Sequence, residues 1–267
     1  MKMLNIACGD RYCEGWINID FHADSNSVTK VNILGGLPFE DNSIDVIYSS
    51  HFLEHLSPVQ AKFVLLETRR VLKSGGIIRV SVPDLENICV EYLKLLEEAS
   101  QNRSLQSKYD FIVIELLDQL VRVNSGGEMA RFFDLVVDSK NIELANYVLY
   151  RTGDELLNVG NLKKNNGITL AKVKNKILYF YLSVIRFLIP KNLRSLVLTN
   201  TSIGEKHQWM YDRLSMTNLL EGIGFNNVVI KSYDKSDIKE FDSYLLDMKE
   251  DGTPYKGVSS LYIEAYK

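Results

Sequence analysis

Short apolar runs bounded by turn residues recur through the first 85 residues, and they predict strands at 4–7, 16–20, 28–33, 44–49 and 76–82. The last two, IDVIYSS and GIIRVSV, are continuous β-branched runs, which are typical of strands covered on both faces. Between them, SPVQAKFVLLETRRVLKSGG has helical spacing, with Ser57 as the predicted N-cap and Gly75-Gly76 as the predicted end. A strand–helix–strand unit predicts a parallel pair joined by a right-handed crossover.

The pattern changes after Pro83. A helix is predicted at about 85–99, and residues 100–204 are mostly of helical pattern with few clear strand signals. A helix at 215–225 and strands at 226–231 and 259–267 follow, which suggests an antiparallel hairpin at the edge of a parallel sheet. We therefore expect one α/β domain formed by residues 1–100 and 205–267, with residues 101–204 inserted as a helical lid.

Composition narrows the class of protein. The chain has 267 residues, of which 46% are hydrophobic and 24% charged, and a net charge of −3. These values are ordinary for a soluble globular protein and argue against a nucleic-acid partner, which usually requires a basic excess. Cys8, Cys13 and Cys89 are too few for a disulfide framework and lack a second pair for a zinc site, so we expect reduced thiols. With no signal-peptide pattern at the N-terminus, the expected location is cytoplasmic.

The stretch LNIACGDRYCEGWINID places two strand patterns around a very short turn. A parallel crossover normally needs about a dozen residues, so this one must be a bare loop without a helix. Asp20 ends the second strand, where a carboxylate can accept both hydroxyls of a ribose. Since ligands of open α/β sheets bind outside the carboxyl ends of the strands, the stretch predicts a nucleoside site. The alternative is a tight core turn.

The segments LNIACG, GWINID, LPFEDNSIDVIYSSHFLEHL and RRVLKSGGIIRVSVPD together resemble the class I S-adenosylmethionine-dependent methyltransferases. The likeness is greatest to a branch with a short first loop that is associated with surface-polysaccharide and glycan biosynthesis. The later segments GEKHQWMYDRLSMTNLLEGIGF and SSLYIEAYK resemble the same branch. The resemblance implies a Rossmann-like seven-stranded sheet in the order 3-2-1-4-5-7-6 with its last strand antiparallel. It also implies S-adenosylmethionine as the cofactor and S-adenosylhomocysteine as the product.

The resemblance further implies which residues hold the cofactor. Its methionine part would lie against the first turn, its ribose on Asp20, and its adenine beside the end of the third strand. Asn32 departs from the pattern there, since an aspartate is common at this position. The full predicted cofactor set is Ala7, Cys8, Gly9, Asp20, Phe21, Asn32, Ile33, Leu34, Ser50 and His51.

Methyl transfer from a sulfonium requires alignment of the acceptor and, for a hydroxyl acceptor, removal of its proton. Histidine is the usual base, and the chain has only four. His51 directly follows the fourth strand, His207 follows the lid, and His55 shares a helical face with His51. These are the predicted catalytic residues, in the order His51, His207, His55. The alternative is that each is a buried or capping histidine.

His51, Glu54 and His55 also resemble the ExxEH metal set of some small-RNA and quinone methyltransferases, with histidine replacing the first glutamate. His207 could supply a fourth ligand. So many imidazoles would suit a transition metal better than Mg²⁺. Because the LEHL motif is also widespread in metal-free relatives, we expect no metal.

Predicted acceptor-binding residues come from two places. An aromatic cluster with a carboxylate and a guanidinium suits a sugar or nucleotide-linked acceptor, and lid arginines suit phosphate or carboxylate. The alternatives are core packing, a helix cap and solvated surface arginines. The predicted set is Trp209, Tyr211, Asp212, Arg213, Arg131 and Arg151.

The expected function is O-methylation of a sugar hydroxyl or phosphate-type oxygen on a surface-polysaccharide precursor, for capsule or lipopolysaccharide. The alternatives are an N- or C-methyltransferase of a small metabolite and a non-catalytic cofactor-binding subunit. A dinucleotide oxidoreductase is disfavoured, because the first loop is too short to present a helix N-terminus to a pyrophosphate. The basic and apolar segment 172–194 leaves open a membrane-surface contact, burial in the lid or a homodimer contact.

Overall fold

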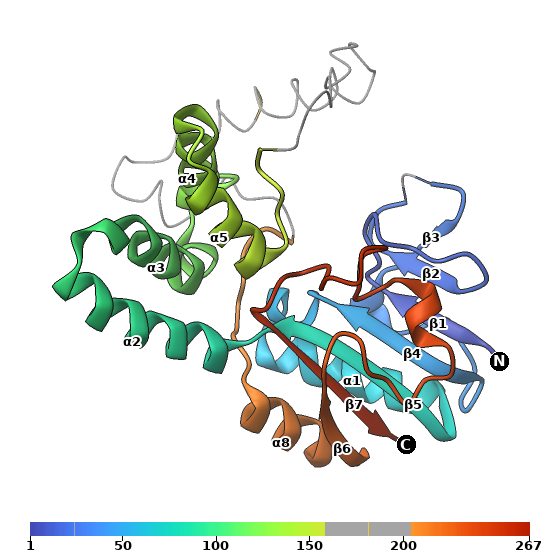
Figure 1. The fold of residues 1–267 in the computed structure, drawn as a ribbon. Helices are drawn as coiled ribbons and strands as arrows, with labels where there is room; N and C mark the ends of the chain where they lie inside the picture. Colours follow the sequence, from blue (N-terminus) through green and yellow to red (C-terminus); the bar gives the residue numbers. More distant parts are fainter. Residues whose placement is uncertain (24, 158–180, 182–203) are drawn as a thin grey trace.

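The computed structural model of the chain describes residues 1–23, 25–157, 181 and 204–267. Its centre is a seven-stranded sheet in the order β3-β2-β1-β4-β5-β7-β6 (Figure 1). The strands are β1 (Met3–Ile6), β2 (Ile17–Asp20), β3 (Val28–Lys30), β4 (Ile44–Ser50), β5 (Leu72–Pro83), β6 (Asn226–Lys231) and β7 (Ser260–Tyr266). The first five are parallel, and β7 runs antiparallel to both β5 and β6. The predicted sheet order and the antiparallel last strand are therefore confirmed.

Two predicted boundaries are wrong. The strand predicted at 28–33 ends at Lys30, and a short 3₁₀ turn, η1 (Ile33–Gly35), follows it. The helix predicted to stop at Gly75-Gly76 ends at Val71, and both glycines lie inside β5. The pairing of β4 with β5 shifts register here, and a Cβ on Gly76 would meet the backbone oxygen of Asp45 at 2.8 Å. Gly76 thus allows β5 to approach β4 closely at this irregularity, and neither glycine ends a helix.

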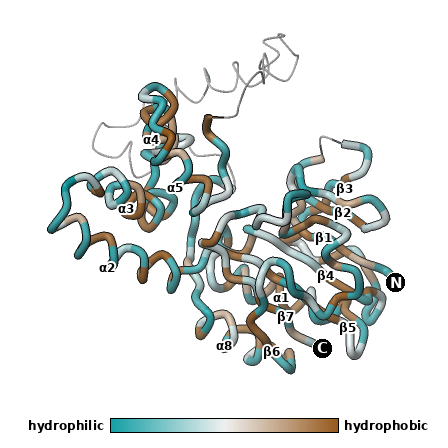
Figure 2. The backbone as a smooth tube through the Cα atoms, viewed as in Figure 1, coloured by the Kyte–Doolittle hydropathy of each residue, from teal (hydrophilic) through white to brown (hydrophobic). Residues whose placement is uncertain are grey.

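Helices α1 (Pro58–Val71) and α8 (Arg213–Ile223) pack on one face of the sheet. Ser57 begins α1 with a capping box, in which its side chain accepts from the Gln60 amide and the Gln60 side chain accepts from the Ser57 amide. Alternate strand residues such as Ile47 face these helices, because side chains along a strand point to opposite faces in turn. Hydrophobic colouring accordingly runs along the strands (Figure 2).

A loop, and not a helix, packs on the opposite face of the sheet. Since the crossover between β1 and β2 is a bare loop, as predicted, no helix is available there. A cluster of Trp16, Tyr48, Phe241 and Leu246 forms instead, and it brings in the segment 232–247 with its 3₁₀ turn η4 (Phe241–Tyr244). Trp16 meets Tyr244 edge-to-face at 5.2 Å between ring centroids. A loop therefore replaces the absent helix.

A buried ion-pair network fastens this loop to the sheet. The guanidinium of Arg79, on β5, donates from Nε to Asp247 at 2.6 Å and from Nη1 to Glu264 at 2.8 Å. All three side chains are almost completely buried. The hydroxyl of Tyr48 donates to the other Asp247 oxygen at 2.6 Å. Each buried charge thus has a partner, which is the condition for burying it without a large penalty.

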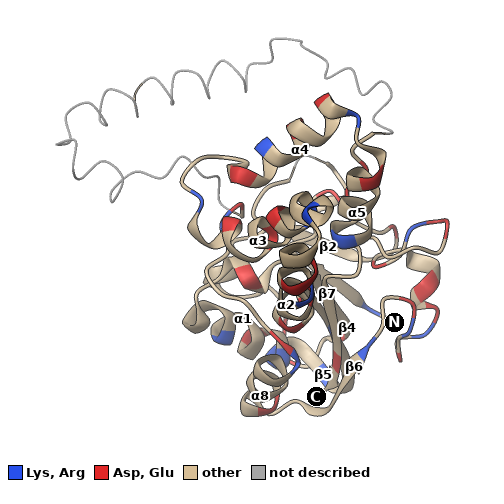
Figure 3. Ribbon diagram, turned by 60° about the vertical axis from the view of Figure 1, so that its left-hand side comes forward, with Lys and Arg blue, Asp and Glu red and all other residues tan. Residues whose placement is uncertain are grey.

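The segment between β5 and α8 begins with α2 (Leu85–Gln101), α3 (Gln106–Val121), α4 (Gly127–Ser139) and α5 (Ile142–Thr152), which gather to one side of the sheet (Figure 1). They share small cores around Phe111 and Ile112, and their outer surface carries both signs of charge (Figure 3). The predicted helical pattern is confirmed for the described residues up to Thr152. The two ends of the segment meet, because Asp84 bridges to Tyr211 and the Leu85 amide donates to the Tyr211 carbonyl at 2.8 Å.

Most of the basic and apolar segment 172–194 lies outside the described residues. Its membrane, lid and dimer interpretations therefore stay predictions, as does the division of the chain at residues 100 and 205. Among the helices that the structure describes, none is long and apolar enough to cross a bilayer. The three cysteines form no disulfide.

Replacing Arg79 with methionine should destabilise the fold strongly. Arg79→Met leaves the carboxylates of Asp247 and Glu264 buried without their cation, so we expect a loss of about 3–5 kcal/mol in the free energy of unfolding. The matched control is Arg131→Met, because Arg131 forms an exposed ion pair with Glu128 at 2.5 Å and should lose at most about 1 kcal/mol. Urea unfolding measures both. Equal losses would show that the buried network does not hold the loop.

Candidate active site

Three cavities adjoin at the carboxyl ends of the parallel strands. The turn cavity, of about 260 Å³, lies beside the first loop, and the Asp20 cavity, of about 570 Å³, lies beyond the end of β2. The helix cavity, of about 330 Å³, lies between the sheet edge and the helical insertion. His51 lines all three, and Ala7 lines the first two. His51 is therefore the point at which the cavities converge.

His51 and Ala7 share an unusual backbone conformation. Their φ angles are +49° and +53°, in the left-handed region that residues other than glycine rarely adopt. Each directly follows a strand, β4 or β1, so the strain lies where the chain must turn out of the sheet. Strain of this kind persists only where the surroundings enforce it, and it is concentrated at functional sites.

The imidazole of His51 is held from two sides. Its Nε2 lies 2.9 Å from the hydroxyl of Ser260, at the start of β7, and its Nδ1 lies 3.4 Å from a carboxylate oxygen of Glu54. Burial, followed by the positive charge of Lys256, lowers the pKa of His51 well below its usual value. His51 is thus neutral at neutral pH, which is the form that a general base requires.

Asp20 fixes the first turn. One oxygen of its carboxylate accepts from the Gly9 amide at 2.9 Å, and the other accepts from the His22 amide at 2.9 Å. The carboxylate lies at the end of β2 and lines the Asp20 cavity, where the sequence analysis expects a ribose. Gly9 adopts φ +52°, which a glycine tolerates without strain.

The structure brings most of the predicted cofactor residues to these cavities. Cys8, Gly9 and Ser50 line the turn cavity, and Asp20, Phe21, Asn32 and Leu34 line the Asp20 cavity, with Ala7 and His51 common to both. Ile33 is different, because its side chain is fully buried in the core and lines neither cavity. Burial raises the pKa of the Cys8 thiol to about 12, so it stays protonated.

The helix cavity is mostly polar. From the sheet edge it is lined by His51, Glu54, His55 and His207, and from the insertion by Glu115, Gln119, Met129, Thr152 and Asp154. Lys256, from the loop before β7, lines both this cavity and the turn cavity. The cavity therefore presents both hydrogen-bond donors and acceptors beside His51.

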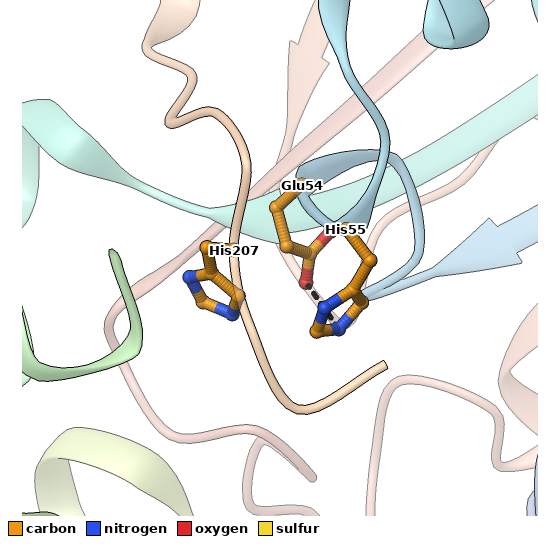
Figure 4. Close-up of side chains that lie close together, drawn as sticks. All are labelled: Glu54, His55 and His207. Carbon is orange, nitrogen blue, oxygen red and sulfur yellow. Dashed lines mark ion pairs between the residues drawn. The ribbon is translucent and has the colours of Figure 1, made fainter. Parts of the chain in front are cut away.

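Glu54, His55 and His207 lie together at the inner wall of the helix cavity (Figure 4). Glu54 and His55 belong to the 3₁₀ turn η2 (Leu53–His55), which follows β4. Burial raises the pKa of Glu54 to about 8 and lowers that of His207 to about 3. The rings of His55 and His207 are 5.0 Å apart between centroids.

The predicted acceptor residues that follow the insertion do not lie at the cavities. Tyr211 is buried in the main core, and Asp212 caps α8 by accepting from the Ser215 amide at 2.7 Å. Arg213 is exposed and pairs with Glu86 at 2.7 Å, while Trp209 is half exposed. None of these four lines the three cavities. In the part of the chain that the structure describes, the aromatic acceptor platform expected from HQWMYDR therefore does not line these cavities, because these residues connect the insertion to the sheet.

The two lid arginines are also engaged elsewhere. Arg151 is buried, with its guanidinium 2.9 Å from Glu115 and 2.7 Å from Asn87. Arg131 is exposed on α4 and pairs with Glu128. Neither lines the helix cavity, whereas Lys256, which is not among the predicted site residues, does. No local pattern marks Lys256, since the antiparallel return of the chain to β7 is what carries it to the site.

Comparison with known proteins adds to this geometry. Residues 20–80 match a family described as "Methyltransferase domain". A protein of Aspergillus luteorubrus named "Probable methyltransferase ltbC" is 44% identical over 48 residues, which are 18% of this chain and 17% of that protein. An "Uncharacterized 37.1 kDa protein in transposon TN4556" of Streptomyces fradiae is 36% identical over 73 residues, 27% of this chain and 20% of that protein. The chain thus spans a fifth or less of the curated relatives it matches.

Among solved structures, a SAM-dependent methyltransferase from Archaeoglobus fulgidus aligns over 100% of this chain and 86% of that one, at 13% identity and a TM-score of 0.39. The family match and the sheet order together support the class of SAM-dependent methyltransferases with a Rossmann-like fold. They likewise support S-adenosylmethionine as the cofactor and S-adenosylhomocysteine as its product.

Neutralising Asp20 should weaken binding of S-adenosylhomocysteine. Hydrogen bonds to a charged group contribute about 1.5–3 kcal/mol, so Asp20→Asn should raise the dissociation constant roughly ten- to a hundredfold. Glu14→Gln, in the same loop but exposed, makes the same chemical change and should leave the affinity unaltered. Calorimetry measures both. An unchanged affinity for Asp20→Asn would place the ribose elsewhere.

Proposed function

We propose that this protein transfers a methyl group from S-adenosylmethionine to an oxygen of a polar acceptor, with His51 as the general base. The observation that carries the proposal is the position of His51, which lines the turn, Asp20 and helix cavities at once. A reacting methyl group must lie where cofactor and acceptor meet, and this is the point common to the three cavities.

The residues that line the cavities support this assignment. The Asp20 cavity takes the adenosine, with Asp20 on the ribose and Phe21, Asn32 and Leu34 around the base. The turn cavity takes the methionine part, because it continues from Ala7 on the other side. The helix cavity is left for the acceptor, beneath the inserted helices.

The reaction then follows from the geometry. The acceptor oxygen attacks the methyl carbon, the carbon–sulfur bond breaks toward the sulfur, and S-adenosylhomocysteine leaves as a neutral thioether. His51 takes the proton of the acceptor hydroxyl, and its Nε2 already meets a hydroxyl, that of Ser260, at 2.9 Å. The carboxyl group of Glu54, 3.4 Å from Nδ1, favours the resulting imidazolium in its ionised form. Alignment within the cavities lowers the barrier further.

The polar lining of the helix cavity favours a hydroxylated acceptor. Gln119, Thr152 and Asp154 can pair with sugar hydroxyls, and the ammonium of Lys256 suits a phosphate-type oxygen. Together with the resemblance to the glycan branch, this supports a precursor of a surface polysaccharide as the acceptor. The alternatives are N- or C-methylation of a small metabolite and a cofactor-binding subunit without turnover.

Incubation with isotopically labelled S-adenosylmethionine tests the acceptor. We expect mass spectrometry to find label on nucleotide sugars or glycan intermediates, and on oxygen. Label on nitrogen or carbon of a small metabolite would favour the first alternative. Binding of S-adenosylhomocysteine without turnover of any glycan precursor would favour the second, and binding of NAD in its place would overturn the methyltransferase assignment.

Replacing His51 tests the base. His51→Gln preserves the size of the side chain but cannot take a proton, so we expect turnover to fall by about 10²–10⁴-fold. His51→Ala should show the same loss. Affinity for S-adenosylhomocysteine is measured in parallel and should be retained. If both variants keep their turnover, the proton leaves by another route.

A further inference from the structure

Glu54 is an unusual buried acid. Its side chain is completely inaccessible to solvent, and neither carboxylate oxygen accepts a hydrogen bond from any described residue. Two imidazole nitrogens lie near its carboxylate, His51 Nδ1 at 3.4 Å and His55 Nε2 at 3.9 Å. A buried carboxyl group without a partner is costly in either protonation state, since a protonated group also needs partners. Both oxygens of this buried acid are therefore left without a hydrogen bond from the described residues.

The neighbouring histidines are oriented toward the same point. His55 places Nδ1 at 3.1 Å from the Lys206 carbonyl, so Nδ1 carries the proton and the lone pair of Nε2 faces Glu54. A backbone carbonyl that fixes the tautomer of an imidazole is the usual outer contact of a metal-binding histidine. His207 completes the group, and one ligand atom from each of the three residues lies within 4.8 Å of the others (Figure 4).

The backbone fixes this arrangement. The His207 amide donates to the Gln119 carbonyl at 2.9 Å, and the Gln208 amide donates to the Glu54 carbonyl at 2.7 Å. The chain that leaves the insertion is thus fastened directly to the turn that carries Glu54 and His55. Residues far apart in the sequence are held together before any ligand arrives.

We propose that Glu54, His55 and His207 bind a divalent transition-metal ion, with an open coordination position toward the helix cavity. One carboxylate and two imidazoles form a ligand set typical of zinc sites that keep a fourth position for water or substrate. Such a set suits Zn²⁺ or Co²⁺ better than Mg²⁺ or Ca²⁺, which prefer oxygen ligands. Bonds of about 2.1 Å place tetrahedral ligands about 3.4 Å apart, so the site contracts by roughly 1 Å on binding.

A metal ion bound to these three residues would contact the acceptor as well as lie near the proposed base, His51. All three ligands line the helix cavity, so the open position faces the space in which the proposed function places the acceptor. The metal there orients an acceptor oxygen and lowers the pKa of its hydroxyl. The proposal departs from the expectation of no metal. His207, which the sequence offers as a possible further ligand, lies with Glu54 and His55 so that one ligand atom of each is within 4.8 Å of the others.

Metal binding can be measured on the whole chain without any acceptor. Protein stripped with a chelator is titrated with Co²⁺, and we expect a visible d–d absorption that saturates at one ion per chain. After incubation with Zn²⁺ and gel filtration, elemental analysis should find one zinc per chain. The zinc-bound protein should also unfold at a higher temperature, because the ion binds the folded state.

Variants assign the ion to this cluster. Glu54→Gln and His207→Ala should each weaken Co²⁺ affinity by about tenfold or more, whereas His22→Ala removes an imidazole outside the cluster and should bind as the wild type does. Circular dichroism checks that each variant is folded. The proposal is overturned if the wild-type chain binds no stoichiometric Co²⁺ or Zn²⁺, or if folded Glu54→Gln and His207→Ala bind them with unchanged affinity. Neither outcome depends on the identity of the acceptor or on turnover.

Discussion

The buried pairing of Arg79 with Asp247 and Glu264 is the interaction on which the site depends most. The loop between β1 and β2 is too short for a helix, so one face of the sheet would otherwise expose Trp16 and Tyr48. The segment 232–247 covers that face, and Arg79 fastens it. Leu246, Tyr255 and Lys256, which line the turn cavity, are reached only because this part of the chain lies against the sheet. A charge network in the core thus shapes the wall of a binding site.

The carboxyl edge of the sheet gathers groups of different chemistry. Asp20 is the last residue of β2, Ala7 follows β1, and His51 follows β4 in a strained conformation. Gln119, from helix α3 of the insertion, and His207, from the segment that follows the insertion, line the helix cavity at this edge. The three cavities therefore meet at His51, which is the described residue that lines all of them.

The sheet order and the position of Asp20 could be predicted from the sequence, because alternating apolar runs and a terminal acid are local signals and the family resemblance supplied the strand order. The residues on the acceptor side of the site could not be predicted from the sequence. Arg151 suggested an anion site, yet its guanidinium neutralises Glu115, 36 positions away. Asp212 and Tyr211 suggested a ligand platform, yet one caps a helix and the other packs in the core. Lys256 carried no signal at all. Long-range pairing decides these roles, and a single sequence does not display it.

The insertion leaves the sheet at Leu85 and returns at Tyr211, and these two residues are joined by a backbone hydrogen bond of 2.8 Å. The segment between them is therefore an insertion whose two ends are fixed at the sheet. The entropy cost of closing such a loop grows only with the logarithm of its length. A change in the length of this segment therefore costs the fold little stability, because the sheet that holds its two ends stays as it is.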